Sequence, residues 1–169
     1  YSVHVQQNAG AALQHHEYLA EGTHSTQLEF IENLLQTLGN TGSIVVYNQA
    51  FENTRLRELK EEFPHLEASI SEVQQRIVDL MTPFRRRFYY IPEMKNSYSI
   101  KNVLPAVVPE LSYELLSISN GVDASAAFYN LKHENDATKI NEVRNALLEY
   151  CGLDTMAMVK LLEKLLQLN

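Results

Sequence analysis

A short apolar run that leads into a helical pattern limits the possible folds of this chain more than any other feature. Ile44-Val-Val-Tyr47 is a continuous apolar stretch, which suits a strand buried on both faces of a sheet. Phe51 to Glu62 then places Leu56 and Leu59 at helical spacing. A second strand-like run follows at Arg76 to Leu80. This alternation of strand and helix predicts an α/β unit.

The rest of the chain predicts a hairpin and several helices around that unit. Ser2–Gln7 and His15–Ala20 would pair as antiparallel strands across the turn-prone Asn8-Ala9-Gly10. The first helix is expected from an N-cap at Ser25 or Thr26 to a stop at Gly39. Further helices are expected over Leu66–Gln75, Ser99–Leu104 before Pro105, Ala124–Leu131 and Asn141–Tyr150, with the last helix extending to about Leu168. We therefore expect one α/β domain over residues 1–169, a sheet covered by helices.

Bulk properties exclude several classes of protein. No apolar run approaches the roughly 18 residues that a membrane span requires, so no membrane partner is expected. The single Cys151 excludes a disulfide framework and favours the reduced cytoplasm. A formal net charge of −7 argues against indiscriminate binding to phosphate backbones. The first residues include neither a methionine nor a signal pattern, which favours a piece of a longer chain.

A phenol and a carboxylate lie four residues apart near the end of the chain, at Tyr150 and Asp154. If a helix runs through both, they point to the same side and could hold a metal ion and a water. The alternative is that Gly152 breaks the helix and Asp154 caps the final one, where its side chain would accept from backbone amides.

A similar arrangement follows the first buried strand, where Asn48 precedes Glu52 by four residues. We expect this stretch and the Tyr150 stretch to belong to one site. Taken separately, Asn48 could cap the following helix and Glu52 could be an ordinary acid in its first turn. Asp79, at the end of the second strand, is either an auxiliary acid near the site or a capping or salt-bridging residue.

A basic and aromatic stretch offers groups that bind nucleic acid. Arg85-Arg86-Arg87 lies between Phe84 and Phe88-Tyr89-Tyr90, which supplies cations for phosphates and rings for bases. An exposed basic turn with core aromatics is the other interpretation. Lys101 could meet a phosphate or be solvated. His15, His16 and His24 lack the spacing of a metal-ligand set, and Cys151 is expected to be a buried thiol.

Two of these stretches resemble motifs of a known enzyme family. Ile44-Val-Val-Tyr-Asn48-x-x-Phe51-Glu52 resembles the second motif of the DEDD metal-dependent 3′–5′ exonucleases, and Tyr150-x-x-x-Asp154 resembles their third motif in its tyrosine version. Nearly the whole chain also resembles an uncharacterised bacterial family catalogued as domain of unknown function 2779. That second resemblance is carried by Asn96–Pro105, Leu111-Ser-Tyr113 and Tyr150–Met158.

The exonuclease resemblance implies a fold, a reaction and roles for residues. The fold would be ribonuclease H-like, a mixed sheet flanked by helices, and two Mg²⁺ or Mn²⁺ ions would assist hydrolysis of DNA or RNA. Asp154 would be a metal ligand, Tyr150 would orient the attacking water, and Glu52 would hold the second ion. Asn48 and Phe51, which belong to the second motif, are expected to contact the substrate. Arg85, Arg86 and Lys101 are expected to do so because of their charge.

The chain departs from the exonuclease pattern in two respects. Glu52 stands where these exonucleases mostly have Asp, which shifts the carboxylate by roughly an ångström. The first motif, Asp-x-Glu, is absent before Ile44, so it is expected upstream in the parent chain, and this piece should be inactive alone. The alternative is a non-catalytic module of the same fold that binds nucleic acid or a neighbouring protein segment.

Overall fold

The computed structural model describes residues 1–8, 10–21, 26–114 and 116–168. They form two compact units, the first comprising Tyr1–Phe30 and Ser112–Ala157, the second Ile31–Leu111 and Met158–Asn169. Each unit is described by itself. Ala9 of the expected turn, the candidate ligand His24 and the expected cap Ser25 lie outside the described residues.

The first unit contains the expected N-terminal hairpin. Strand β1 (Ser2–Val5) pairs antiparallel with β2 (Gln14–Glu17), and the register places Ser2 opposite Glu17. The tyrosine rings of Tyr1 and Tyr18, just outside the paired strands, stack with their centroids 5.9 Å apart. The prediction of this hairpin is confirmed.

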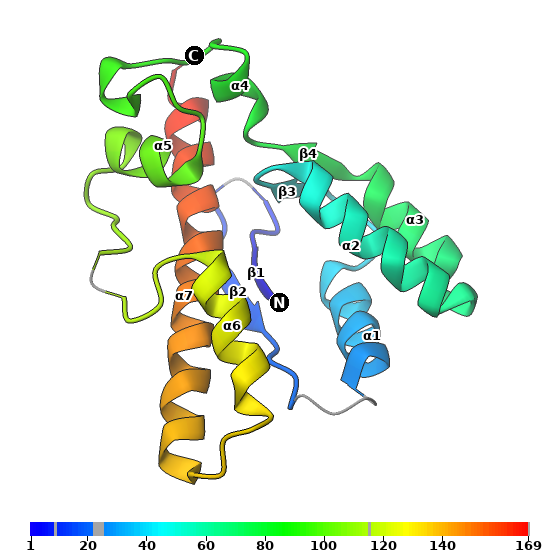
Figure 1. The fold of residues 1–169 in the computed structure, drawn as a ribbon. Coiled ribbons are helices and arrows are strands. Elements are labelled where there is room, and N and C mark those ends of the chain that lie inside the picture. The colour runs from blue at the N-terminus through cyan, green and yellow to red at the C-terminus, as the bar shows by residue number, and fades with distance from the viewer. Residues whose placement is uncertain (9, 22–25, 115, 169) are drawn as a thin grey trace. The chain divides into compact units, whose positions relative to one another are not determined.

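Helix α6 (Gly121–Leu131) runs beside the part of helix α7 (Ala137–Leu166) that belongs to the first unit, up to Ala157 (Figure 1). Asn120 begins α6, because its Oδ1 accepts from the amides of Val122 and Asp123 at 3.1 and 3.0 Å. Three buried residues form the local core, Ile118, Leu147 and Tyr150. Apolar residues of α6, Ala124, Ala127, Phe128 and Leu131, pack against them.

Helix α7 is unbroken through Gly152 over its 30 residues. The interpretation of Asp154 as the N-cap of a separate final helix is therefore wrong. A glycine inside a helix costs only about 1 kcal/mol relative to alanine, which is less than the burial of one large apolar side chain contributes. Leu147 and Leu161, on either side of Gly152, are both almost fully buried, so packing on both sides holds the helix together.

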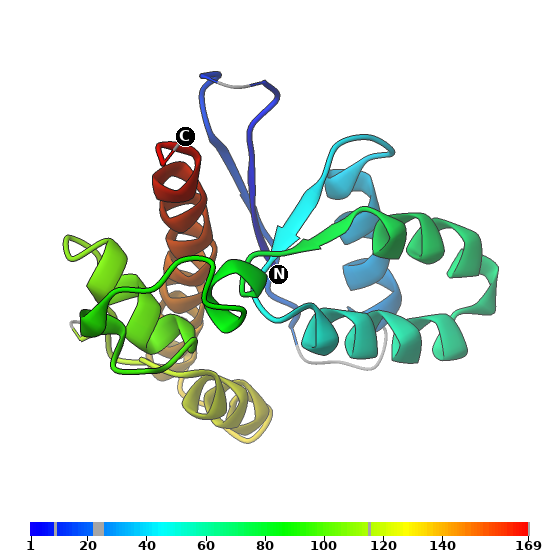
Figure 2. The same cartoon turned by 90° about the horizontal axis from the view of Figure 1, so that it is seen from above.

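The second unit contains the expected α/β unit. Strands β3 (Ile44–Val46) and β4 (Ile77–Asp79) pair in parallel, with Val46 opposite Asp79. Between them run α2 (Gln49–Glu62), a short 3₁₀ turn η1 (Pro64–Leu66) and α3 (Glu67–Gln75). Helices α2 and α3 form an antiparallel pair beside the strands (Figures 1 and 2). Helix α1 (Thr26–Leu38) precedes β3 and ends at Gly39 in the left-handed region, φ 53°, as the sequence predicted.

After β4 the second unit continues through short pieces, α4 (Thr82–Arg85), η2 (Pro92–Met94) and α5 (Ile100–Val107). The prediction that the helix after Ser99 stops before Pro105 is wrong. The proline lacks its own N–H and its ring crowds the preceding turn. The helix nevertheless closes three residues later with a 2.7 Å bond from the amide of Val108 to the carbonyl of Leu104. Val103, Leu104 and Val107 are buried, and this packing carries the helix past the ring.

The mixed α/β class is confirmed. The strands, however, pair as two separate two-stranded sheets, the antiparallel β1–β2 and the parallel β3–β4, and each sheet lies within one unit. Among the described residues, no helix combines the length and the apolar character needed to cross a bilayer.

Candidate functional site

Tyr150 and Asp154 lie one turn apart on α7, where the sequence placed them. The Tyr113 hydroxyl donates to Asp154 Oδ1 at 2.6 Å, and the rings of Tyr113 and Tyr150 have their centroids 6.1 Å apart. Asp154 is half-buried and Tyr150 is 9% exposed. Two phenols and one carboxylate thus form a compact polar group beside the core of the first unit.

The Tyr150 phenol stays protonated in this environment. Burial is the largest cause that raises its pKa, followed by the charge of Asp154 and a hydrogen bond with that side chain. A phenol in this state can donate a hydrogen bond to a carboxylate or a water. Cys151, expected to be buried, is only half-buried, and burial raises the pKa of its thiol, which lowers its reactivity.

A second polar network adjoins Asp154 through the next residue along α7, Thr155. The Thr155 hydroxyl lies 2.7 Å from Ser2 Oγ and 2.9 Å from His4 Nδ1. Ser2 Oγ also lies 2.8 Å from His15 Nε2, and the His4 and His15 rings stack at 4.4 Å. Burial, followed by the neighbouring His15, lowers the pKa of His4. The network fixes the hairpin to α7 through neutral hydrogen bonds.

The second unit gathers polar groups where its two parallel strands end. Asp79 Oδ1 accepts from the amides of Asn48 and Met81, each at 3.0 Å. Asn48 occupies the N-cap position of α2 with left-handed backbone angles, φ 74° and ψ 68°, and its side chain makes no capping bond. Asp79 therefore fixes the backbone at the residues that precede α2 and α4, Asn48 and Met81. The carboxyl end of a parallel pair is the common place for ligands in open α/β sheets.

Glu52 and Phe51 lie in the first turn of α2, directly after that strand end. One carboxylate oxygen of Glu52 is buried, and the residue as a whole is half-buried. The Phe51 side chain is 62% exposed, with the Arg55 guanidinium 5.8 Å from its ring centroid. Two of the expected substrate residues, Asn48 and Phe51, thus lie at the same strand end as Glu52.

The arginine stretch combines both of the interpretations that the sequence allowed. Phe84 is a core residue at 2% exposure, whereas Phe88 is 76% exposed. Arg85 and Arg86 are exposed, and so is Lys101 on α5. The stretch therefore presents cations and the exposed rings of Phe88 and Tyr90 to solvent.

The predicted site residues divide between the two units. Tyr150 and Asp154 belong to the first, and the second contains Asn48, Phe51, Glu52, Arg85, Arg86 and Lys101. The expectation that the two groups form one site stays a prediction.

The donors fit a hard divalent ion, because Asp154 and Glu52 offer carboxylate oxygen. In the part of the chain that the structure describes, no group of three or more His, Cys, Asp or Glu side chains is placed to hold a metal ion.

Sequence reasoning missed Tyr113 as a site residue. It is 41 positions from Asp154, and no helical or strand period connects them. Its one signal was the Leu111-Ser-Tyr113 stretch, which carried the family resemblance without a role.

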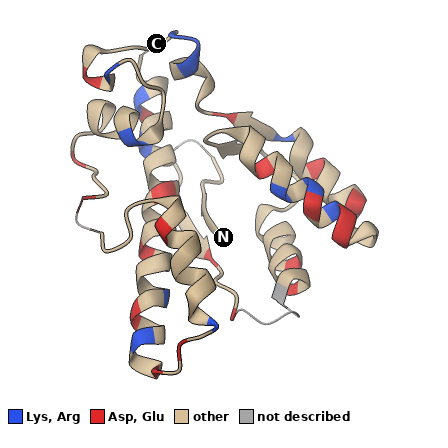
Figure 3. Cartoon of the chain, in the orientation of Figure 1, with Lys and Arg blue, Asp and Glu red and all other residues tan. Residues whose placement is uncertain are grey.

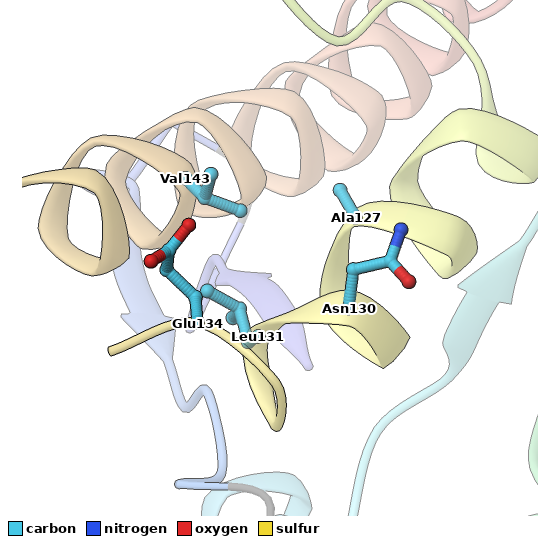
Figure 4. Close-up of a pocket in the computed structure, with 5 residues that line it drawn as sticks. All are labelled: Ala127, Asn130, Leu131, Glu134 and Val143. Atoms are coloured by element: carbon cyan, nitrogen blue, oxygen red, sulfur yellow. The ribbon is translucent and has the colours of Figure 1, made fainter. Parts of the chain in front are cut away.

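One shallow hollow of about 220 Å³ lies between α6 and α7 of the first unit (Figure 4). Ala127, Asn130, Leu131, Glu134 and Val143 line it. The Glu134 carboxylate already accepts from the amides of Asn135 and Asp136 at 2.9 and 3.0 Å, and these bonds lower its pKa. The Glu134 carboxylate thus holds the turn that leads into α7, and Asn130 is the other polar side chain of the hollow.

Comparison with known proteins identifies a family. The model of the Domain of unknown function (DUF2779) matches residues 1–99. The chain belongs to this family.

One curated relative is the Uncharacterized protein UU173 of Ureaplasma parvum serovar 3 (strain ATCC 700970), which is 31% identical over 137 residues. The match covers 69% of this chain and 19% of that protein, so the chain spans about a fifth of the relative's length. No solved structure matches the chain significantly.

Proposed function

We propose that this DUF2779 chain is part of a metal-dependent nuclease that hydrolyses phosphodiester bonds in DNA or RNA. One observation carries the proposal: α7 runs unbroken through Gly152, so Tyr150 and Asp154 share a helix face. That geometry is the one that the tyrosine version of the third DEDD motif requires, and an N-cap role for Asp154 would have removed it. The ribonuclease H-like fold remains part of this proposal.

Asp154 is proposed as a metal ligand. An ionised carboxylate offers about four lone-pair positions, so the hydrogen bonds from Tyr113 and Tyr150 leave coordination capacity on Asp154. These donors also fix the rotamer of the carboxylate, as the outer partners of metal ligands do. Tyr113 thereby becomes a positioning residue of the site.

Tyr150 and Glu52 have the two remaining chemical roles. Because its pKa is raised, Tyr150 holds its proton at neutral pH and can orient a water by donating or accepting a hydrogen bond. Glu52 supplies a second carboxylate from the first turn of α2. A divalent Mg²⁺ or Mn²⁺ ion, when bound, would lower the pKa of a water and stabilise charge on the phosphoryl oxygens.

A second candidate function is a non-catalytic module that binds nucleic acid. It is favoured by the Tyr113–Asp154 hydrogen bond, since a carboxylate used to hold the segment around Tyr113 onto α7 needs no metal. The presence of Glu52 where the exonucleases mostly have Asp also favours the non-catalytic module, because the extra methylene displaces the carboxylate from the position that Asp would give.

The deciding experiment is a cleavage assay on the full-length protein with end-labelled single-stranded DNA and RNA, in Mn²⁺ and in EDTA. The test variants are Asp154→Asn and Glu52→Gln, and the matched control is Glu149→Gln, an exposed acid on the same helix. We expect stepwise shortening that requires Mn²⁺ and falls about 100-fold or more in both test variants. Absence of metal-dependent cleavage in the unmodified protein, or cleavage that survives Asp154→Asn, would favour the binding module.

A further inference from the structure

A segment of the second unit is strongly basic within an acidic chain. Between Asp79 and Glu110 lie five of the 14 cationic residues, Arg85, Arg86, Arg87, Lys95 and Lys101, and one acid, Glu93. Figure 3 shows this concentration at the end of α4, in the turn after η2 and in α5. We call residues 85–101 the basic aromatic segment. Its local positive charge contrasts with the net charge of −7 for the whole chain.

The cations of this segment are available to a ligand. Arg85, Arg86 and Arg87 are all exposed. The lysine and arginine ion pairs formed by the described residues involve other cations, Arg55 and Lys160. The three arginines thus keep their charge open to solvent, where it can meet phosphate groups bidentately.

Aromatic rings stand among these cations at the surface. Phe88 is 76% exposed, and Tyr90 and Tyr98 are 39% and 49% exposed. The Arg87 guanidinium lies 5.7 Å from the centroid of the Tyr90 ring, a cation–π arrangement. Full burial of a phenylalanine side chain stabilises a fold by about 1.5–3 kcal/mol. The exposed ring of Phe88 contributes little of this free energy to folding.

The backbone holds this ring outward. The amides of Phe88 and Tyr89 both donate to the carbonyl of Pro83, at 2.9 and 3.2 Å. Phe84 before the turn and Met94 after it are 2% and 0% exposed, which anchors the segment on both sides. Phe88 is therefore presented from a fixed turn rather than from a loose loop.

Backbone strain is concentrated in the same place. Three non-glycine residues of this segment, Arg87, Lys95 and Asn96, have φ between 52° and 57°. Such a conformation costs about 1 kcal/mol or more at Arg87 and Lys95, whereas asparagine adopts it more readily; residues strained in this way cluster at functional sites. The Tyr90 hydroxyl, which donates to Asn96 Oδ1 at 3.1 Å, links two parts of the strained stretch.

We propose that the basic aromatic segment binds single-stranded nucleic acid without regard to sequence, with a base stacked on Phe88 and phosphates on Arg85 and Arg86. An exposed ring among arginines matches unpaired bases, whose faces are accessible, better than it matches a duplex, whose bases are stacked internally. The inference rests on the proposed function, which gives nucleic acid as the class of ligand. It adds that the bound nucleic acid is single-stranded and that Phe88 and Tyr90 belong to the binding surface.

The test measures binding in EDTA, so that cleavage does not contribute. The full-length protein is titrated into a fluorescein-labelled oligothymidylate of about 15 nucleotides, a length within the range that single-strand-binding folds cover, and anisotropy is followed at several salt concentrations. Phe88→Ala should weaken binding about 5- to 100-fold, the loss of one stacked base, with the salt dependence unchanged. Phe88→Trp should restore the affinity.

Charge removal should give a different signature. The double variant Arg85→Ala/Arg86→Ala should weaken binding and reduce the slope of log K against log salt by about 0.7 for each lost phosphate contact. The control variants, Arg57→Ala on α2 and Tyr129→Ala on α6, remove an exposed arginine and an exposed ring elsewhere and should bind like the unmodified protein.

Several outcomes would overturn the inference. One is equal binding by the unmodified protein and Phe88→Ala; another is tighter binding to a duplex of the same length. Flotation with vesicles of anionic phosphatidylserine and no binding to the oligonucleotide would assign the segment to a membrane surface instead. Binding in EDTA without Mn²⁺-dependent cleavage would contradict the nuclease proposal alone. Cleavage that is unaffected by Phe88→Ala and by the arginine double variant would contradict only the present inference.

Discussion

The Tyr113 hydroxyl donates a 2.6 Å hydrogen bond to Asp154 Oδ1 across 41 residues of sequence. A bond from a neutral phenol to an ionised carboxylate is short and stronger than a neutral pair. It joins the segment after α5 to the middle of α7, next to the core formed by Ile118, Leu147 and Tyr150. The same contact fixes the orientation of the proposed metal ligand.

Tyr113→Phe should lower the free energy of unfolding by about 1.5–3 kcal/mol, because it removes a donor to a charged group in a half-buried position. Tyr129→Phe is the matched control, since that ring is 61% exposed and its hydroxyl loss should change stability by less than about 0.5 kcal/mol. Urea denaturation of both variants measures the difference. Equal stabilities would show that the Tyr113 bond adds nothing.

Gly152→Ala should raise the free energy of unfolding by about 0.5–1 kcal/mol, because alanine is the better residue inside a helix. An added Cβ would meet His15 Cε1 at 3.7 Å, an ordinary van der Waals contact. Gly39→Ala is the contrasting variant: its φ of 53° strains any side chain, so it should destabilise the protein although the surrounding space is open. Thermal unfolding distinguishes the two. A destabilising Gly152→Ala would mean that α7 is interrupted there.

Arg76→Lys should destabilise the protein by about 2 kcal/mol, despite the retained charge. The Arg76 guanidinium donates to carbonyls at the end of α1 and just after it, at 2.5 Å to Gly39, 2.6 Å to Thr41 and 3.3 Å to each of Leu38 and Gly42. A lysine has one ammonium group and cannot reproduce this fork. Arg57→Lys, at an exposed position of α2, should stay within about 0.5 kcal/mol of the unmodified protein. Guanidinium chloride denaturation measures the stability of both variants. Equal losses of stability would refute a specific role for the guanidinium group of Arg76.

Local patterns predicted most of the elements in the fold. The hairpin, the helix from Thr26 to Leu38 and the strand–helix–strand unit of β3, α2 and β4 follow from hydrophobic periods of two and 3.6 residues. The helix stop expected at Pro105 and the alternative of a helix break at Gly152 are both absent from the structure, for one reason. Both residues weaken a helix locally, and buried neighbours outweigh that effect, which single-residue propensities do not report.

The sequence predicted the components of the candidate site better than their contacts. It identified Tyr150 and Asp154 because they lie one turn apart on a helix. It missed the Tyr113 donor and left the role of Asp79 open, because each binds a group more than 30 residues away and no period connects such positions. Those contacts depend on how segments far apart in the sequence pack together.

Alkaline pH should destabilise the protein through Tyr150. Burial and then Asp154 raise the pKa of this phenol above the ordinary value of about 10, so the folded state retains a proton that the unfolded state has lost. Stability should therefore fall as pH rises from about 10 towards the folded pKa. Tyr150→Phe has no proton to lose, and its stability should fall less steeply over the same interval than that of Tyr129→Phe, which retains Tyr150. Urea denaturation at a series of pH values from about 9 to 11.5, which brackets the ordinary tyrosine pKa, measures both slopes. Parallel slopes would mean that Tyr150 titrates as a solvated tyrosine, and the buried phenol beside Asp154 would then not exist in solution.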